Sequence, residues 1–137
     1  QGRGTSIAAA LEYLDRVVHR RGVVFIISDF RDHGYDASLR RLSRRHDTIA
    51  VNLVDPREHE LPNVGMLTFQ DAETNEQILI DSTDARVRDE FCAEERRMAI
   101  ERGRLFRSLG VDEICVDAAG SYVESLVHFF KARSKRN

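Results

Sequence analysis

The first part of the chain alternates between a helical repeat of apolar residues and a short continuous apolar run. Before residue 20, apolar side chains recur at helical spacing at Ile7, Leu11, Leu14 and Val18. This spacing predicts a helix over residues 6–20 that Gly22 ends. Residues 23–27 follow as an uninterrupted run rich in β-branched side chains, which is typical of a strand buried on both faces of a parallel sheet.

The same alternation is repeated further along the chain. A second helix is predicted from four residues at helical spacing, Tyr35, Leu39, Leu42 and His46. Residues 48–54 and 112–116 are predicted to form two more buried strands. Ser121 begins a capping-box sequence, which indicates the start of a last helix. We expect the inward residues of that helix to be Tyr122, Val123, Leu126, Val127 and Phe130.

Between the second and third strands the pattern changes. Two short apolar segments, residues 66–69 and 77–80, flank a polar stretch and predict a β-hairpin. A long helix over residues 85–109 is then expected, with Gly110 as its end. Its predicted apolar stripe consists of Val87, Phe91, Met98, Leu105 and Leu109.

These elements predict an α/β fold, because helices that alternate with buried strands join those strands in parallel through crossover connections. We therefore expect a Rossmann-like layered sheet, mainly parallel and flanked by helices, with an inserted β-hairpin. No linker or internal repeat divides the sequence, so residues 1–137 are expected to form a single domain. The basic segment 131–137 is expected to be disordered.

Composition narrows the classes of function. Lys and Arg number 21 against 23 Asp and Glu, a net charge of −2, which argues against a dedicated nucleic-acid or membrane-surface domain. No apolar run approaches the roughly 20 residues that span a bilayer. The two cysteines lack metal-type spacing and no signal peptide is apparent, so a cytoplasmic location is expected. Because the sequence starts at Gln1 rather than methionine, we expect it to be part of a longer protein.

Polar residues that could support chemistry follow the predicted strands. Ser28, Asp29 and Asp32 follow the first strand, Asp55 follows the second, and residues 117–120 follow the third. Ligands of open α/β sheets bind outside the carboxyl ends of the strands, where the start of the first helix should also lie. Strand-end carboxylates beside a helix start indicate a hard-cation or phosphate site.

Structural roles explain the same residues. Thr5 can cap the first helix, Asp29 can accept backbone hydrogen bonds in a turn, and Asp55-Pro56 is an ordinary turn sequence. Asp32, His33 and Asp36 could form a transition-metal site with Asp29, but a solvated loop is the preferred interpretation.

Several segments follow one another in a familiar order: residues 4–11, 26–30, 44–47, 54–58, 60–65 and the hairpin through Asp71 and Glu73. In these segments, the chain resembles the C-terminal part of members of a bacterial family catalogued as domain of unknown function fifty-eight. The resemblance extends from residue 4 to about residue 130. Members of this family look like von Willebrand factor type A domains. The resemblance implies that the first strands of the full fold precede Gln1.

The resemblance also implies a metal-ion-dependent adhesion site. In such domains the ion is held by an Asp-x-Ser-x-Ser motif, by a Thr that Thr5 matches, and by a strand-end Asp that Asp29 matches. The Asp-x-Ser-x-Ser motif does not occur in the sequence, and Asp81-Ser82-Thr83 has a different spacing. Two ligands cannot fix an octahedral ion, so we expect Mg²⁺ or Mn²⁺ in the longer parent and none bound by this chain alone.

Two classes of function are expected from these residues. The first is a non-enzymatic protein-interaction module, whose partner by resemblance is a MoxR-type AAA+ ATPase. The alternative is a small metal-assisted hydrolase or phosphate-handling enzyme that uses Asp29, Asp32 and Asp55. If the neighbouring strand is missing, residues 23–27 would expose a hydrophobic edge, so self-association through this edge is also expected.

Overall fold

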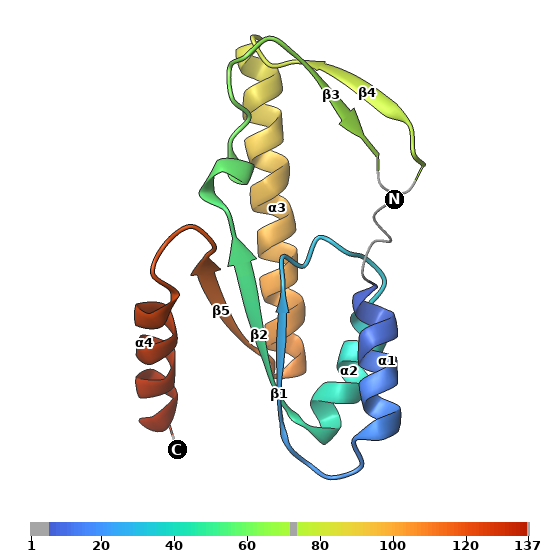
Figure 1. Ribbon diagram of the computed structural model, residues 1–137, viewed down its shortest axis with the longest axis vertical. Coiled ribbons are helices and arrows are strands. Elements are labelled where there is room, and N and C mark those ends of the chain that lie inside the picture. Colours follow the sequence, from blue (N-terminus) through green and yellow to red (C-terminus); the bar gives the residue numbers. More distant parts are fainter. Residues whose placement is uncertain (1–5, 72–73, 137) are drawn as a thin grey trace. The chain divides into compact units, whose positions relative to one another are not determined.

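The computed structural model describes residues 6–71 and 74–136. The elements, shown in Figure 1, follow the order α1 (Ile7–Val17), β1 (Val23–Ser28), α2 (Asp36–Arg45), β2 (Asp47–Val54), the 3-10 helix η1 (Pro56–His59), β3 (Met66–Gln70), β4 (Gln77–Asp81), α3 (Ala85–Leu109), β5 (Asp112–Asp117) and α4 (Tyr122–Ser134). The chain divides into two compact units, residues 1–54 with 102–137, and residues 55–101. None of the helices in the described part combines the length and apolar character needed to cross a membrane.

The first unit is built on a parallel sheet with the strand order β1-β2-β5. Phe25 of β1 pairs with Ile49 of β2, and Val51 of β2 pairs with Ile114 of β5. The α/β fold with a parallel sheet flanked by helices is therefore confirmed. Because β2 lies in the centre, its residues from Thr48 to Asn52 are all buried.

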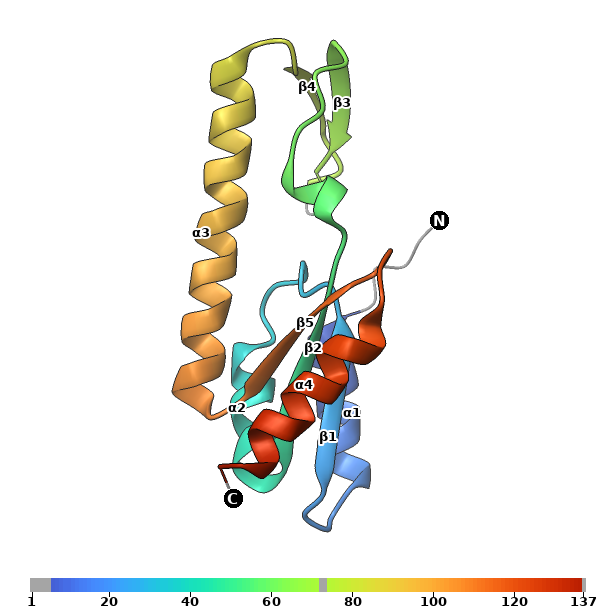
Figure 2. The same ribbon diagram turned by 90° about the vertical axis from the view of Figure 1, so that its left-hand side faces the viewer.

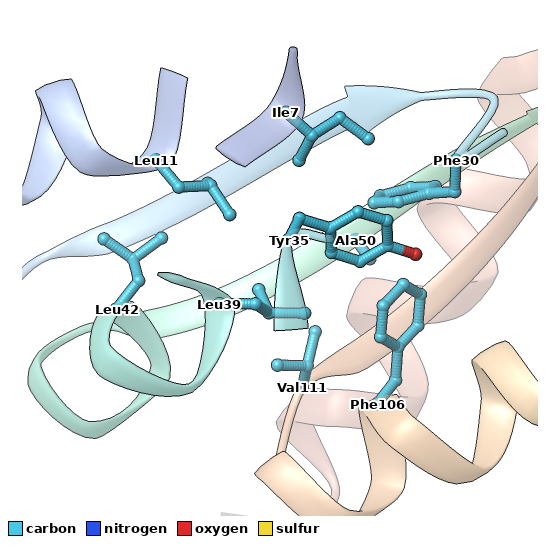
Figure 3. Packing of buried hydrophobic residues seen from close by; sticks show 9 residues of the cluster. All are labelled: Ile7, Leu11, Phe30, Tyr35, Leu39, Leu42, Ala50, Phe106 and Val111. Carbon is cyan, nitrogen blue, oxygen red and sulfur yellow. The ribbon is translucent and has the colours of Figure 1, made fainter. Parts of the chain in front are cut away.

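One face of the sheet is covered by α1, α2 and the C-terminal turns of α3. The buried cluster on this face, drawn in Figure 3, consists of Ile7, Leu11, Phe30, Tyr35, Leu39, Leu42, Ala50, Phe106 and Val111. The predicted stripe of α2 is confirmed, since Tyr35, Leu39, Leu42 and His46 are all buried. Phe106 of α3 is almost fully buried, although the predicted stripe did not include it.

The other face is covered by α4, as Figure 2 shows. Leu126 and Phe129 of α4 pack against a cluster formed by Ile49, Val51, Ile114 and Val116. The predicted inward set of α4 was therefore wrong in most of its members. Tyr122, Val123, Val127 and Phe130 are exposed. They lie to the sides of the contact because α4 meets the sheet mainly over β5 and β2.

Strand β1 also differs from the prediction of a strand buried on both faces. Val24 and Ile26 pack against the cluster beneath α1 and α2. Val23, Phe25 and Ile27 point to the face that α4 covers, where they remain exposed. The reason is positional, because β1 is an edge strand and the buried contacts of α4 are made with β2 and β5.

The ends of the helices agree with the sequence signals in part. Helix α3 ends as predicted before Gly110, whose φ is 68°. The amides of Gly110 and Val111 donate to the carbonyls of Arg107 and Phe106, which is a Schellman motif. Helix α1 ends at Val17, earlier than predicted, because the β-branched Val18 that follows has an extended conformation. Ser121 precedes α4, but its side chain makes no capping hydrogen bond.

The second unit contains the antiparallel pair β3-β4, so the predicted hairpin is confirmed. Ser82, directly after β4, is fully buried. Its hydroxyl donates to the carbonyl of Gly65 at 2.5 Å and accepts from the amide of Val64 at 3.1 Å. These bonds attach the end of β4 to the residues that lead into β3. Phe69 of β3 also packs on Phe91 of α3, with ring centroids 6.5 Å apart.

Candidate functional site at the carboxyl edge of the sheet

The loop after β1 is held by short-range hydrogen bonds and by one buried ring. The hydroxyl of Ser28 accepts from the amide of Phe30 at 3.1 Å, and Asp29 Oδ1 accepts from the amide of Arg31 at 3.2 Å. Phe30 has a φ of 53°, which is uncommon for a residue other than glycine. Its buried ring meets Phe106 edge-on at 5.2 Å, and this packing offsets the backbone cost. Asp29 is thereby left exposed at the end of the strand.

Asp32 connects this loop to the start of α1. Its Oδ2 accepts from the amide of Ile7 at 2.7 Å, and its Oδ1 accepts from the amide of His33 at 2.9 Å. Ser6 caps the same helix, since its hydroxyl accepts from the amide of Ala9. Two amides of the first turn of α1 are therefore satisfied by side chains. The bond from Ile7 to Asp32 brings the beginning of α1 to the loop that contains Asp29, while Thr5 lies outside the described residues.

Asp55 follows β2 and belongs to the second unit. It is the N-cap of η1, where its side chain accepts from the amide of Arg57 at 3.0 Å and pairs with the Arg57 guanidinium at 2.9 Å. These hydrogen bonds from Arg57 hold the pKa of Asp55 below its ordinary value. The carboxylate of Asp55 is thus engaged in a local turn, which is the structural role considered for Asp55-Pro56.

The loop after β5 repeats the arrangement found at Asp29. Asp117 Oδ1 accepts from the amide of Ala119 at 2.8 Å, and the amide of Ala118 donates to the carbonyl of Val54. A Cβ on Gly120 would lie 3.0 Å from Asp117 Oδ2, so this position suits a residue without a side chain. The sequence assigned residues 117–120 no separate role, although an amide partner two residues after an Asp is typical of an Asx turn.

The described residues do not form a complete metal site. Among residues 6–71 and 74–136, no group of three or more His, Cys, Asp or Glu side chains is arranged to hold an ion. Both carboxylate oxygens of Asp32 accept hydrogen bonds from backbone amides, and the alternative cluster of Asp32, His33 and Asp36 with Asp29 is not assembled among the described residues. The donor set present at this edge therefore does not fit a divalent ion by itself.

Comparison with known proteins identifies relatives of the chain. Residues 1–101 match the family described as "Protein of unknown function DUF58". An uncharacterized protein of Mycobacterium avium is 32% identical over 131 residues, which cover 94% of this chain and 76% of that protein. Uncharacterized proteins of Mycobacterium bovis and Mycobacterium tuberculosis are 31% identical over 130 residues.

In the M. bovis and M. tuberculosis proteins the aligned part is 41% of the whole length, so this chain spans less than half of them. No solved structure matches the chain. The aligned region covers 94% of the chain, and the family match covers the sheet up to β2, the hairpin and most of α3. The chain therefore belongs to the bacterial family described as Protein of unknown function DUF58.

Proposed function

We propose that this chain is part of a non-enzymatic protein-interaction module, whose binding surface is the carboxyl edge of the β1-β2-β5 sheet. The main support is the hydrogen bond between the amide of Ile7 and Asp32 Oδ2. This bond holds a helix start against the loop of a strand-end carboxylate, Asp29. An exposed carboxylate fixed in this way is available to a partner without further ordering of its loop, which lowers the entropic cost of binding.

We further propose that the intact protein is of the von Willebrand factor A-like adhesion type and acts in the cytoplasm. In that case Asp29 and Thr5 would be two of the ligands of Mg²⁺ or Mn²⁺, and the ion would present an open position to a carboxylate of the partner. The other ligands would come from the longer protein, since the described residues do not supply them. A MoxR-type AAA+ ATPase is the proposed partner, on the resemblance of the sequence alone.

The test is Mn²⁺ binding by a full-length family member with and without the Asp29 carboxylate. Asp29→Asn keeps the shape of the side chain and its turn hydrogen bond but removes the charge. We expect it to weaken Mn²⁺ binding by at least about tenfold in isothermal titration calorimetry. Asp84→Asn is the matched control, because Asp84 Oδ1 makes the same turn bond to the amide of Arg86 at 2.9 Å.

Equal Mn²⁺ affinity of the wild type and Asp29→Asn would contradict the adhesion-type proposal. The enzymatic alternative is tested separately with a panel of phosphoester substrates. We expect no turnover that depends on Asp29. Hydrolysis that is lost in Asp29→Asn and kept in Asp84→Asn would instead favour the metal-assisted hydrolase.

A further inference from the structure

The helices α1 and α2, with the loop that follows α1, carry a concentration of arginine residues. Residues 16–21 and 40–45 contain seven arginines and no lysine, aspartate or glutamate. All seven arginines are exposed. They form the arginine surface, which consists of Arg16, Arg20, Arg21, Arg40, Arg41, Arg44 and Arg45. Since the whole chain has a net charge of −2, this surface is opposite in sign to the molecule as a whole.

The positive charge is not balanced within the first unit. That unit contains 16 Lys and Arg against 10 Asp and Glu, whereas residues 55–101 contain 5 against 13. Contacts of the fold neutralise only two residues of the arginine surface. The Arg41 guanidinium lies 3.7 Å from the carboxylate of Glu12, and that of Arg45 lies 2.6 Å from the carboxylate of Asp15. Within the described residues, the other five arginines make no ion pair with a carboxylate.

Hydrogen bonds hold the two arginine-rich segments next to each other. Helices α1 and α2 lie side by side, as Figure 1 shows. At their C-terminal ends, the Arg45 guanidinium donates to the carbonyl of Val18 at 3.5 Å. The amide of Gly22 donates to Nδ1 of the buried His46 at 3.2 Å. The loop after α1, with two of the unpaired arginines, is therefore fixed beside the end of α2.

The residue type and the spacing indicate what this surface binds. A guanidinium is a planar fork that matches the two oxygens of a carboxylate, and Arg41 and Arg45 already contact carboxylates. Arg40 and Arg44 are four residues apart, which corresponds to about 6 Å along a helix. Alternate residues of an extended chain are about 6.6–6.8 Å apart. An extended segment with acidic residues at alternate positions can therefore present one carboxylate to each of these two arginines.

We propose that the arginine surface binds an extended acidic segment of a partner protein, with Asp or Glu at alternate positions. Arg40 and Arg44 receive successive carboxylates, and the arginines at the end of α1 extend the contact. The site is separate from the carboxyl edge of the sheet, because the C-terminal ends of α1 and α2 lead into the starts of β1 and β2. It does not depend on a metal ion or on Asp29.

Other anionic partners fit this surface less well. The large apolar side chains of α2, Leu39 and Leu42, are buried, so α2 has no apolar face that could enter a bilayer. Tyr13 is exposed on the same helix as Arg16, but one ring is not the series of stacking rings that single-stranded nucleic acids require. The carboxylates of Glu12 and Asp15 also lie among the arginines, where they would repel closely spaced phosphates.

The test is peptide binding by the full-length protein, measured by fluorescence anisotropy in EDTA so that metal binding at Asp29 has no influence. The probe is a labelled peptide of alternating Glu and Ser. The comparison probes are its Gln-Ser counterpart, a peptide of the same composition with its Glu in one block, vesicles that contain phosphatidylserine, and a single-stranded DNA oligonucleotide. We expect the alternating Glu-Ser peptide to bind most tightly and its affinity to fall as NaCl is added.

Paired variants locate the binding surface. Arg40→Gln combined with Arg44→Gln should weaken binding of the alternating peptide by about tenfold. Lys131→Gln combined with Lys135→Gln is the matched control, because it removes the same charge at the same spacing from exposed residues of α4. Helix α4 covers the opposite face of the sheet, as Figure 2 shows, so this control should bind like the wild type. Circular dichroism checks that both variants are folded.

Three results would overturn the proposal. The first is a full-length protein that does not bind the alternating Glu-Ser peptide, or that binds the Gln-Ser or block peptide equally well. The second is tighter binding to the vesicles or to the oligonucleotide. The third is an equal effect of the α2 and α4 variants, because binding would then depend on net charge and not on the arginine surface.

Discussion

At the scale of single residues, Asp32 differs from the other carboxylates of the strand ends in what it contacts. Asp29 and Asp117 each accept a hydrogen bond from an amide two residues later. Asp32 instead accepts from Ile7, 25 residues away, and so joins the start of α1 to the loop after β1. The sequence suggested that Asp32 could line a crevice, which stays a prediction, and it did not indicate that Asp32 caps the start of α1.

This difference predicts that Asp32 contributes more to stability than Asp29 does. Asp32→Ala leaves the amide of Ile7 without its side-chain acceptor and should lower the free energy of unfolding by about 1–2 kcal/mol. Asp29→Ala removes only a bond within an exposed turn, and its effect should be smaller. Urea unfolding followed by circular dichroism measures both, and equal losses for the two variants would show that the bond to Ile7 contributes nothing.

Individual buried residues could be predicted where burial follows from local spacing. The stripe of α2 is an example, because positions 35, 39, 42 and 46 lie on one side of any helix and all four are buried. Phe30 and Phe106 were not predicted. Their burial depends on each other, across 76 residues of sequence, and neither lies in a local pattern that distinguishes it. The positive φ of Phe30 was not predicted either.

At the scale of elements, α4 was predicted correctly as a helix and wrongly in its orientation. Its apolar residues occur on several sides of the helix, so spacing alone cannot identify the side that meets the sheet. Ion pairs at its C-terminal end supply part of the missing information. The Arg133 guanidinium pairs with Asp47 of β2 and, at 2.9 Å, with Asp112 of β5. These pairs lie within the basic segment 131–137, for which the sequence suggested only disorder.

Arg133 is therefore predicted to hold α4 on the sheet. Arg133→Met keeps most of the aliphatic stem but removes both ion pairs, and it should lower the free energy of unfolding by about 1–2 kcal/mol. The loss should be smaller at high salt, because salt screens these partly exposed ion pairs and so reduces their contribution to the stability of the wild type. Arg136→Met is the control, since Arg136 makes one longer contact, 3.3 Å to Asp112. Urea unfolding at low and high salt measures the free energy of unfolding of each variant. Equal losses of this free energy in Arg133→Met and Arg136→Met would contradict the prediction.

At the scale of the whole molecule, the alternation of helices and apolar runs was sufficient to predict a parallel sheet and the inserted hairpin. The order β1-β2-β5 could not be predicted in the same way, because a strand's place at the edge or the centre depends on its neighbours and not on its own residues. The continuous apolar run of β1 suggested a strand buried on both faces, yet Val23, Phe25 and Ile27 are exposed on one face, and β1 is at the edge of the described sheet. The candidate site was predictable only in part for the same reason. Strand-end carboxylates can be located in a sequence, but their hydrogen-bond partners cannot.

The division into two compact units leads to a prediction about how the molecule opens. Ser82→Ala removes the hydroxyl that joins Val64 and Gly65 to the end of β4, and it leaves the amide of Val64 with only its 3.1 Å bond to the carbonyl of Pro62. The loss of these side-chain bonds should lower the free energy of unfolding by about 0.5–1.5 kcal/mol. Because the bonds of Ser82 lie within the second unit, we expect hydrogen–deuterium exchange to accelerate in β3 and β4 and to stay unchanged in β1, β2 and β5.

Ser43→Ala is the control in the first unit, because the Ser43 hydroxyl donates to the carbonyl of Arg40 within α2. Equal acceleration of exchange in all strands would contradict this prediction. It would mean that the chain opens as one cooperative unit that includes α3.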